Sequence, residues 1–188
     1  MSRINLDKGR SISLDKNGGN VEVSNGWTAP GKDYDLKALV RYRDGRTVYV
    51  GAANKDEILC TREGAVLHGG DVKRPGDREI VTIKWHPDIA SVAVSSYSAL
   101  ENGAGSFQQY GVFVEVKNGP QVIGIAAANT SANGNSYTLC FGEIVFGDEP
   151  GQLTVTNLEM YSKPGSENRI AYKGSKVVMD AGPRGKTK

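Results

Sequence analysis

Two acidic segments, roughly three dozen residues apart, carry the side chains of this sequence that are best suited to chemistry. Asp33 and Asp35 stand two residues apart, so both carboxylates would point to the same side of an extended strand. The second segment supplies Asp71, Asp77 and Glu79 from loops rich in glycine. Carboxylates held close together repel each other, and a bound cation offsets that repulsion. The spacing therefore predicts a cation site built from oxygen ligands, with ordinary solvated turn residues as the alternative.

Other chemistries find little support in the sequence. The two histidines, His68 and His86, lie near no nucleophile-elbow pattern, so a hydrolytic nucleophile would lack its base. No glycine-rich loop opens a helix to cradle phosphate, and no cysteine and histidine spacing suits zinc. We therefore predict a protein without enzymatic activity.

Length, charge and composition narrow the class of protein further. The 188 residues suit one domain, and the net charge of +2 argues against nucleic-acid and membrane-surface partners. No apolar run reaches the length of about 18 residues that a membrane span needs. The first residues lack the apolar centre of a secretion signal, which predicts a cytoplasmic protein.

Elements that could position the acidic segments follow from the alternation of apolar and polar residues along the chain. Together with 24 glycines, the alternation predicts an all-β fold, a two-sheet β-sandwich of short strands with Gly/Asn/Asp turns and little or no helix. Expected strands include residues 4–6, 12–14, 21–23, 36–42, 47–50, 80–85, 89–97, 112–116, 121–125, 137–146, 153–155 and 177–179. Only residues 99–109 could contain a helical turn.

We expect one sandwich domain over residues 4–160. Residues 161–180 would form a C-terminal extension that contains a strand, and residues 181–188 a basic, mobile tail. Trp27 and Trp85 are expected in the core, and Cys60 and Cys140 as reduced, buried thiols.

Several short motifs give the chain a resemblance to a known family. In order, they are I-N-L-D-K-G at residues 4–9, D-Y-D-L at 33–36, H-G-G-D at 68–71 and F-G-E-I at 141–144. In these motifs the chain resembles the TerD family of tellurium-resistance and stress proteins, which are calcium-binding β-sandwiches. The resemblance runs from about residue 4 to about residue 160.

Departures from the family pattern bring cations to the acidic segments. Lys37 stands where the family has a third aspartate, Lys73 and Arg74 occupy a shortened loop, and Arg78 replaces an acid. The resemblance by itself implies two calcium ions. Because these charges lower cation affinity, we expect one weak calcium site or none. Its expected ligands are Asp33, Asp35, Asp71, Asp77 and Glu79, with Glu57 and Asp56 as second choices.

The favoured interpretation is a cytoplasmic TerD-like protein of a stress-response or tellurium-resistance system, which binds calcium weakly and acts through contacts with protein partners. The alternative is a structural or assembly module that has lost calcium. In that case Lys37, Lys73, Arg74 or Arg78 would pair with the aspartates. Its C-terminal extension would contact neighbouring subunits by adding a strand to a sheet edge. A lectin-like sandwich that holds a sugar through the ion is a third interpretation, which the aromatic content of 7% disfavours.

Overall fold

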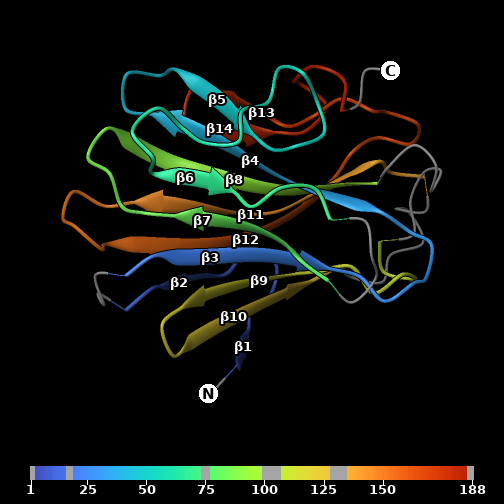
Figure 1. The fold of residues 1–188 in the computed structure, drawn as a ribbon, viewed down its shortest axis with the longest axis horizontal. Helices are drawn as coiled ribbons and strands as arrows, with labels where there is room; N and C mark the ends of the chain where they lie inside the picture. Colours follow the sequence, from blue (N-terminus) through green and yellow to red (C-terminus); the bar gives the residue numbers. More distant parts are fainter. Residues whose placement is uncertain (1–2, 16–18, 73–76, 99–106, 128–134, 186–188) are drawn as a thin grey trace.

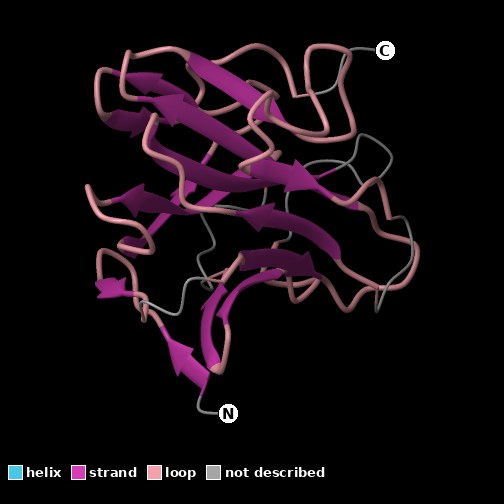
Figure 2. Cartoon of the chain, turned by 60° about the vertical axis from the view of Figure 1, so that its left-hand side comes forward, coloured by secondary structure: helices cyan, strands magenta, loops and turns pink. Residues whose placement is uncertain are grey.

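The computed structural model describes residues 3–15, 19–72, 77–98, 107–127 and 135–185. This part of the chain consists of strands and connecting loops, without a helix (Figure 2). The strands are β1 (Arg3–Asn5), β2 (Ser11–Ser13), β3 (Val21–Gly26), β4 (Tyr34–Tyr42), β5 (Thr47–Val50), β6 (Val66–His68), β7 (Glu79–Ile83), β8 (Ile89–Ser98), β9 (Phe113–Asn118), β10 (Gln121–Ala126), β11 (Thr138–Phe146), β12 (Leu153–Tyr161), β13 (Ala171–Lys173) and β14 (Lys176–Val178).

Two six-stranded sheets make up the body of the molecule. The first sheet has the strand order β1-β10-β9-β3-β7-β6, and the second has the order β2-β12-β11-β8-β4-β5. Strands β13 and β14 form a separate hairpin on the side of β4 and β5, away from β9 and β10 (Figure 1). The predicted all-β two-sheet sandwich is confirmed.

The main core lies between the two sheets because inward and outward side chains alternate along the strands. On β4, Tyr34, Leu36 and Ala38 are fully buried in this core. Trp27 is buried there as expected, and Trp85 is half-buried against it.

Strands β6 and β13 are absent from the strands that the sequence predicts. Each has only three residues, and so short a run shows little alternation. The candidate helical turn lies outside the described residues for 99–106, and residues 107–110 form a turn. No helix in the described part of the chain has the length and apolar character that crossing a membrane requires.

A second, smaller core lies on the outer face of the second sheet. Residues 162–185, which we call the strap, follow β12 and fold back over this face. Ile170 of the strap is buried among Leu39, Ala93 and Cys140, which come from β4, β8 and β11. Tyr172, Val177 and Met179 of the strap pack against the same cluster. The strap thus covers the outer face of the second sheet, whose strand β12 leads into it.

The end of the strap is bonded to earlier residues of the strap itself. The Gly182 amide donates to Arg169 O at 2.9 Å, and the Gly185 amide donates to Glu167 O. Arg184 forms an ion pair with Glu167. Residues 182–185 thus make bonds that the sequence pattern does not reveal, within the range where a mobile tail is expected.

The cysteines differ from each other. Cys140 is fully buried, and burial raises the pKa of its thiol to about 12. Cys60 is exposed, which corrects the expectation that both thiols are buried. Both are free thiols.

Packing of the strap has a measurable consequence. Ile170→Ala leaves a cavity in the second core, so we expect the free energy of unfolding to fall by about 2–5 kcal/mol. Denaturant unfolding measures the change. Ile80→Ala, at a side chain that is 39% exposed, is the matched control and should cost much less. Equal losses in the two variants would show that the strap is not packed in solution.

Candidate functional site

Strand β4 places two of the predicted ligands at one end of the sandwich. Because Tyr34 and Leu36 point into the main core, Asp33 and Asp35 point to the opposite face. Both aspartates are nevertheless largely buried, with exposed fractions of 7% and 5%.

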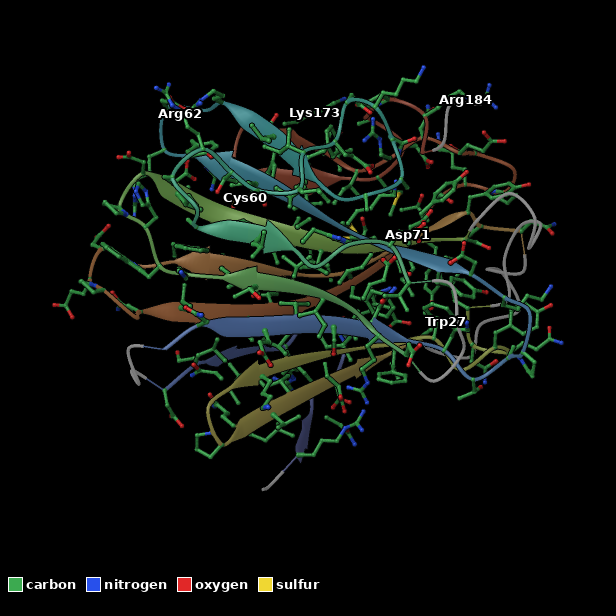
Figure 3. All side chains as sticks on the ribbon, viewed as in Figure 1. Trp27, Cys60, Arg62, Asp71, Lys173 and Arg184 are labelled. Atoms are coloured by element: carbon green, nitrogen blue, oxygen red, sulfur yellow. The ribbon has the colours of Figure 1, made fainter. Side chains whose placement is uncertain are left out.

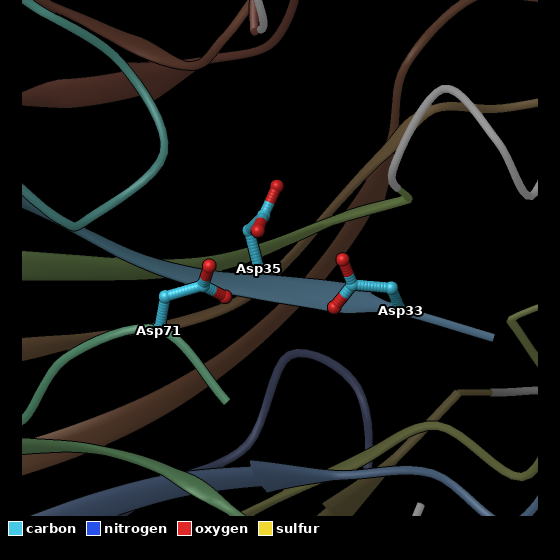
Figure 4. A group of neighbouring side chains, drawn as sticks. All are labelled: Asp33, Asp35 and Asp71. Atoms are coloured by element: carbon cyan, nitrogen blue, oxygen red, sulfur yellow. The ribbon is translucent and has the colours of Figure 1, made fainter. Parts of the chain in front are cut away.

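Asp71 completes a cluster of three carboxylates, which we call the aspartate trio. One carboxylate oxygen of each of Asp33, Asp35 and Asp71 lies within 4.8 Å of the others. Asp35 lies on β4, Asp33 directly precedes that strand, and Asp71 comes from the loop after β6 (Figure 4). Asp71 is exposed, so the cluster opens to solvent toward the end of the molecule where Trp27 also lies (Figure 3). Three like charges at this distance favour a bound cation.

Glu79 and His68 hold the two segments of the trio together. Glu79 Oε2 accepts the amide of Leu36 at 2.5 Å, and its Oε1 accepts the amide of Val72 at 3.1 Å. His68 Nε2 donates to Leu36 O at 3.1 Å, while its Nδ1 accepts the Gly70 amide at 3.0 Å. That arrangement assigns the proton of a neutral imidazole to Nε2. Both side chains therefore join the residue after Asp35 to the residues on either side of Asp71.

These bonds are possible because one edge of β4 is open. The pairing of β5 with β4 ends at Val50, opposite Ala38, so Leu36 lies beyond it. Asn25 of β3 bonds the same region of β4, since its amide nitrogen donates to Tyr34 O at 2.8 Å. Asn25 pairs with Glu79 in the first sheet. Side chains of the first sheet thus provide hydrogen-bond partners for backbone groups of the second sheet.

Glu57 lies in a separate, buried network of charges. Its side chain is 0% exposed, and its Oε1 accepts from Lys37 Nζ at 2.7 Å and from Arg169 at 3.0 Å. Its Oε2 accepts the amides of Ala53 and Asn54, each at 2.9 Å. Burial by itself raises the pKa of Glu57, but the charge and hydrogen bond of Lys37 and the bonds from Asn54 outweigh it, so the pKa lies below its usual value.

The remaining predicted ligands lie apart from the trio. Asp56 is about half exposed and pairs with Arg169. Asp77 is exposed and forms an isolated β-bridge just before β7. The structure therefore brings together Asp33, Asp35 and Asp71, with Glu79 engaged in backbone bonds beside them.

Of the cations expected beside the site, the structure describes Lys37 and Arg78, and of these two Lys37 is in place. Burial lowers its pKa, and the charges of Glu57 and Asp35 oppose that shift. Arg78 instead pairs with Glu115 on the first sheet, which corrects the hypothesis that it pairs with the aspartates. Lys73 and Arg74 lie outside the described residues.

Sequence analysis missed Arg169 and the bonding roles of Asn25 and His68. Arg169 lies 112 residues from Glu57, and no motif surrounds it. Asn25 belongs to none of the motifs named above. His68 belongs to the H-G-G-D motif, which was the one indication available for any of them.

Comparison with known proteins gives one informative likeness. No protein-family profile matches the sequence, and no curated protein matches it either. A solved structure does match: a homologue of the telluride resistance protein TerD from Streptomyces coelicolor A3(2). The TM-score is 0.53 at 15% sequence identity, over 76% of this chain and 91% of the other. The fold is TerD-like. At this identity the likeness concerns the TerD-like sandwich alone.

The bonds of Glu79 yield a testable expectation. Glu79→Gln replaces one acceptor oxygen with an amide donor, so the amide of Leu36 or Val72 loses its partner. We expect the free energy of unfolding to fall by about 1–3 kcal/mol. Glu22→Gln, at a side chain that is 51% exposed, is the control, with a change within about 0.5 kcal/mol. A loss in Glu79→Gln no larger than the control's would contradict the proposed bonding.

The lowered pKa of Glu57 predicts a dependence of stability on pH. Because the pKa of Glu57 in the folded protein lies below its ordinary value of 4.5, the stabilisation is complete above that pH and is lost as the pH falls through the folded pKa. Glu57→Gln should therefore be less stable than the parent at neutral pH but lose less on acidification. Thermal unfolding from about pH 6 down to about pH 3 measures both slopes. Parallel slopes would show that Glu57 does not titrate in this way.

Proposed function

We propose that this protein binds a single calcium ion weakly at the aspartate trio and acts in a stress-response or tellurium-resistance system through contacts with protein partners, without catalysis. The observation that carries the proposal is the convergence of Asp33, Asp35 and Asp71, from two separate segments, within 4.8 Å.

The donor set fits a hard cation. It offers carboxylate oxygens only, which calcium prefers, and no histidine or cysteine belongs to the cluster as zinc or copper would favour. Three carboxylates supply part of the roughly six to eight oxygens that calcium takes, and backbone carbonyls and water would supply the rest. Asp33 and Asp35 would hold the ion from the buried side, and Asp71 from the open side.

Two features favour weak binding at one site. Lys37 lies close enough to Asp35 for their charges to interact, and this cation opposes a bound one. Glu57 is already neutralised by Lys37 and Arg169, so it offers no second site of comparable charge.

The physiological part of the proposal rests on the TerD-like fold and on the family motifs. The neighbour is described as a homologue of a telluride resistance protein. Partner contacts in the cytoplasm account for such a role better than chemistry on a tellurium compound, because the trio presents anionic groups that would repel an oxyanion.

The buried network favours a second candidate, a structural module that has lost the ion. Lys37, Arg169 and Glu57 already balance charge within the protein, as such a module would require. Contact with neighbouring subunits through the C-terminal extension would need the strap to leave the second core, where Ile170 is 1% exposed.

Calcium titration separates the two candidates. A ligand that binds only the folded state raises the melting temperature by mass action. We expect chelator-treated protein to melt at a higher temperature in millimolar calcium, and Asp35→Asn to lose that response. Asp148→Asn, at a side chain that is 95% exposed, is the control and should respond like the parent. An unchanged melting temperature in the parent would remove the calcium proposal and leave the structural module.

A further inference from the structure

The strap reaches the same end of β4 that carries the aspartate trio. The side chain of Arg169 is 3% exposed, and its two terminal nitrogens bond Glu57 and Asp56. Its guanidinium also lies over the ring of Tyr49, 4.1 Å from the ring centroid. A buried guanidinium held in this way fixes the middle of the strap, next to Ile170, against the loop after β5.

The last described residue of the strap lies over Lys37. Gly185 O accepts a hydrogen bond from Lys37 Nζ at 3.1 Å, and the side chain of Asn54 donates to the same oxygen. Gly185 is buried against Tyr97, and a Cβ at this position would collide with the Tyr97 ring. The strap therefore ends in a fitted contact, and that contact depends on the ammonium group of Lys37.

Lys37 is also the link to the trio. It lies two residues from Asp35 on the same face of β4, so the two side chains are neighbours. One ammonium group thus interacts with the strap, with Glu57 and with the proposed cation site.

We infer that docking of the strap and binding of a cation at the aspartate trio oppose each other through Lys37 and Arg169. The inference rests on the proposed function, because it concerns regulation of that same site. A bound cation offsets the charge of Asp35 that helps to hold Lys37, and it repels both Lys37 and Arg169. The docked strap, in turn, keeps the charge of Arg169 near the site and lowers its affinity for a cation. Because the coupling is a free energy between two sites, it acts equally in both directions.

Hydrogen exchange on the unmodified protein is the first test. The amides of Gly182 and Gly185 are bonded within the strap, so their exchange reports its docking. Saturating calcium chloride should accelerate exchange at both amides by at least about threefold, a modest value for coupling between sites. Amides of β3, in the first sheet, serve as the internal reference.

A charge variant supplies the second test. Arg169→Gln removes the strap's charge but retains a hydrogen-bond donor, so it should bind calcium at least about threefold more tightly than the parent. Lys117→Gln is the matched control, because it removes one charge at an exposed residue of the first sheet that pairs with Glu22. Isothermal titration with calcium chloride measures all three affinities.

The outcomes separate this inference from the proposed function. If calcium binds the parent but leaves exchange at Gly182 and Gly185 unchanged, the inference is overturned while the calcium site stands. The same holds if Arg169→Gln and Lys117→Gln bind with equal affinity. If calcium binds Arg169→Gln and not the parent, calcium binding by the parent fails as its function, while the opposition between strap docking and cation binding is supported. If neither protein binds calcium, the proposed function fails and the inference fails with it.

Discussion

The open edge of β4 is the constraint on which this end of the molecule depends. Strand β5 ends opposite Ala38, so the backbone groups of Tyr34 and Leu36 need other partners. A buried backbone group without a partner costs about 1–3 kcal/mol. Three side chains of the first sheet, those of Asn25, His68 and Glu79, provide these partners. The same bonds bring the segments of Asp35 and Asp71 together, so satisfying the backbone and gathering the carboxylates are one structural solution.

The negative charges at this end of the sandwich fall into two groups: Glu57, which cations of the protein itself neutralise, and the aspartate trio. Glu57 is neutralised inside the protein by Lys37 and by Arg169, which arrives from the strap. A buried ion pair of this kind adds little net stability but is costly to break, because one charge would remain buried alone. The aspartate trio lies next to this network and opens to solvent through Asp71. Lys37 lies between the two groups, and its position decides how much negative charge remains for a cation.

The local alternation of apolar and polar residues predicted most of the strands. The arrangement of the site depends on contacts between residues far apart in the sequence. Alternation along the chain predicted the sandwich and most of its strands, because the period of two is a local property. The same period placed Asp33 and Asp35 on one face. It could also have shown that Arg78, next to the inward-pointing Glu79, points away from the trio. The partners of Glu57 could not be predicted, since Arg169 lies 112 residues away and bare charge does not specify which carboxylate it meets. The roles of Asn25 and His68 depend on where β5 ends, which no motif records.

Differences along the strap determine which part of it can respond to charge. Its middle is held by apolar burial, since Ile170 lies in the second core and Tyr172, Val177 and Met179 pack on it. A fully buried side chain such as Ile170 contributes about 1.5–3 kcal/mol, the partly buried ones add less, and a change of charge at a distance does little to remove either contribution. The terminal part, residues 182–185, is held mainly by hydrogen bonds, and the one to Lys37 depends directly on an ammonium group. A charge added at the trio would therefore loosen the end of the strap while its middle stays packed, which leaves the second sheet covered.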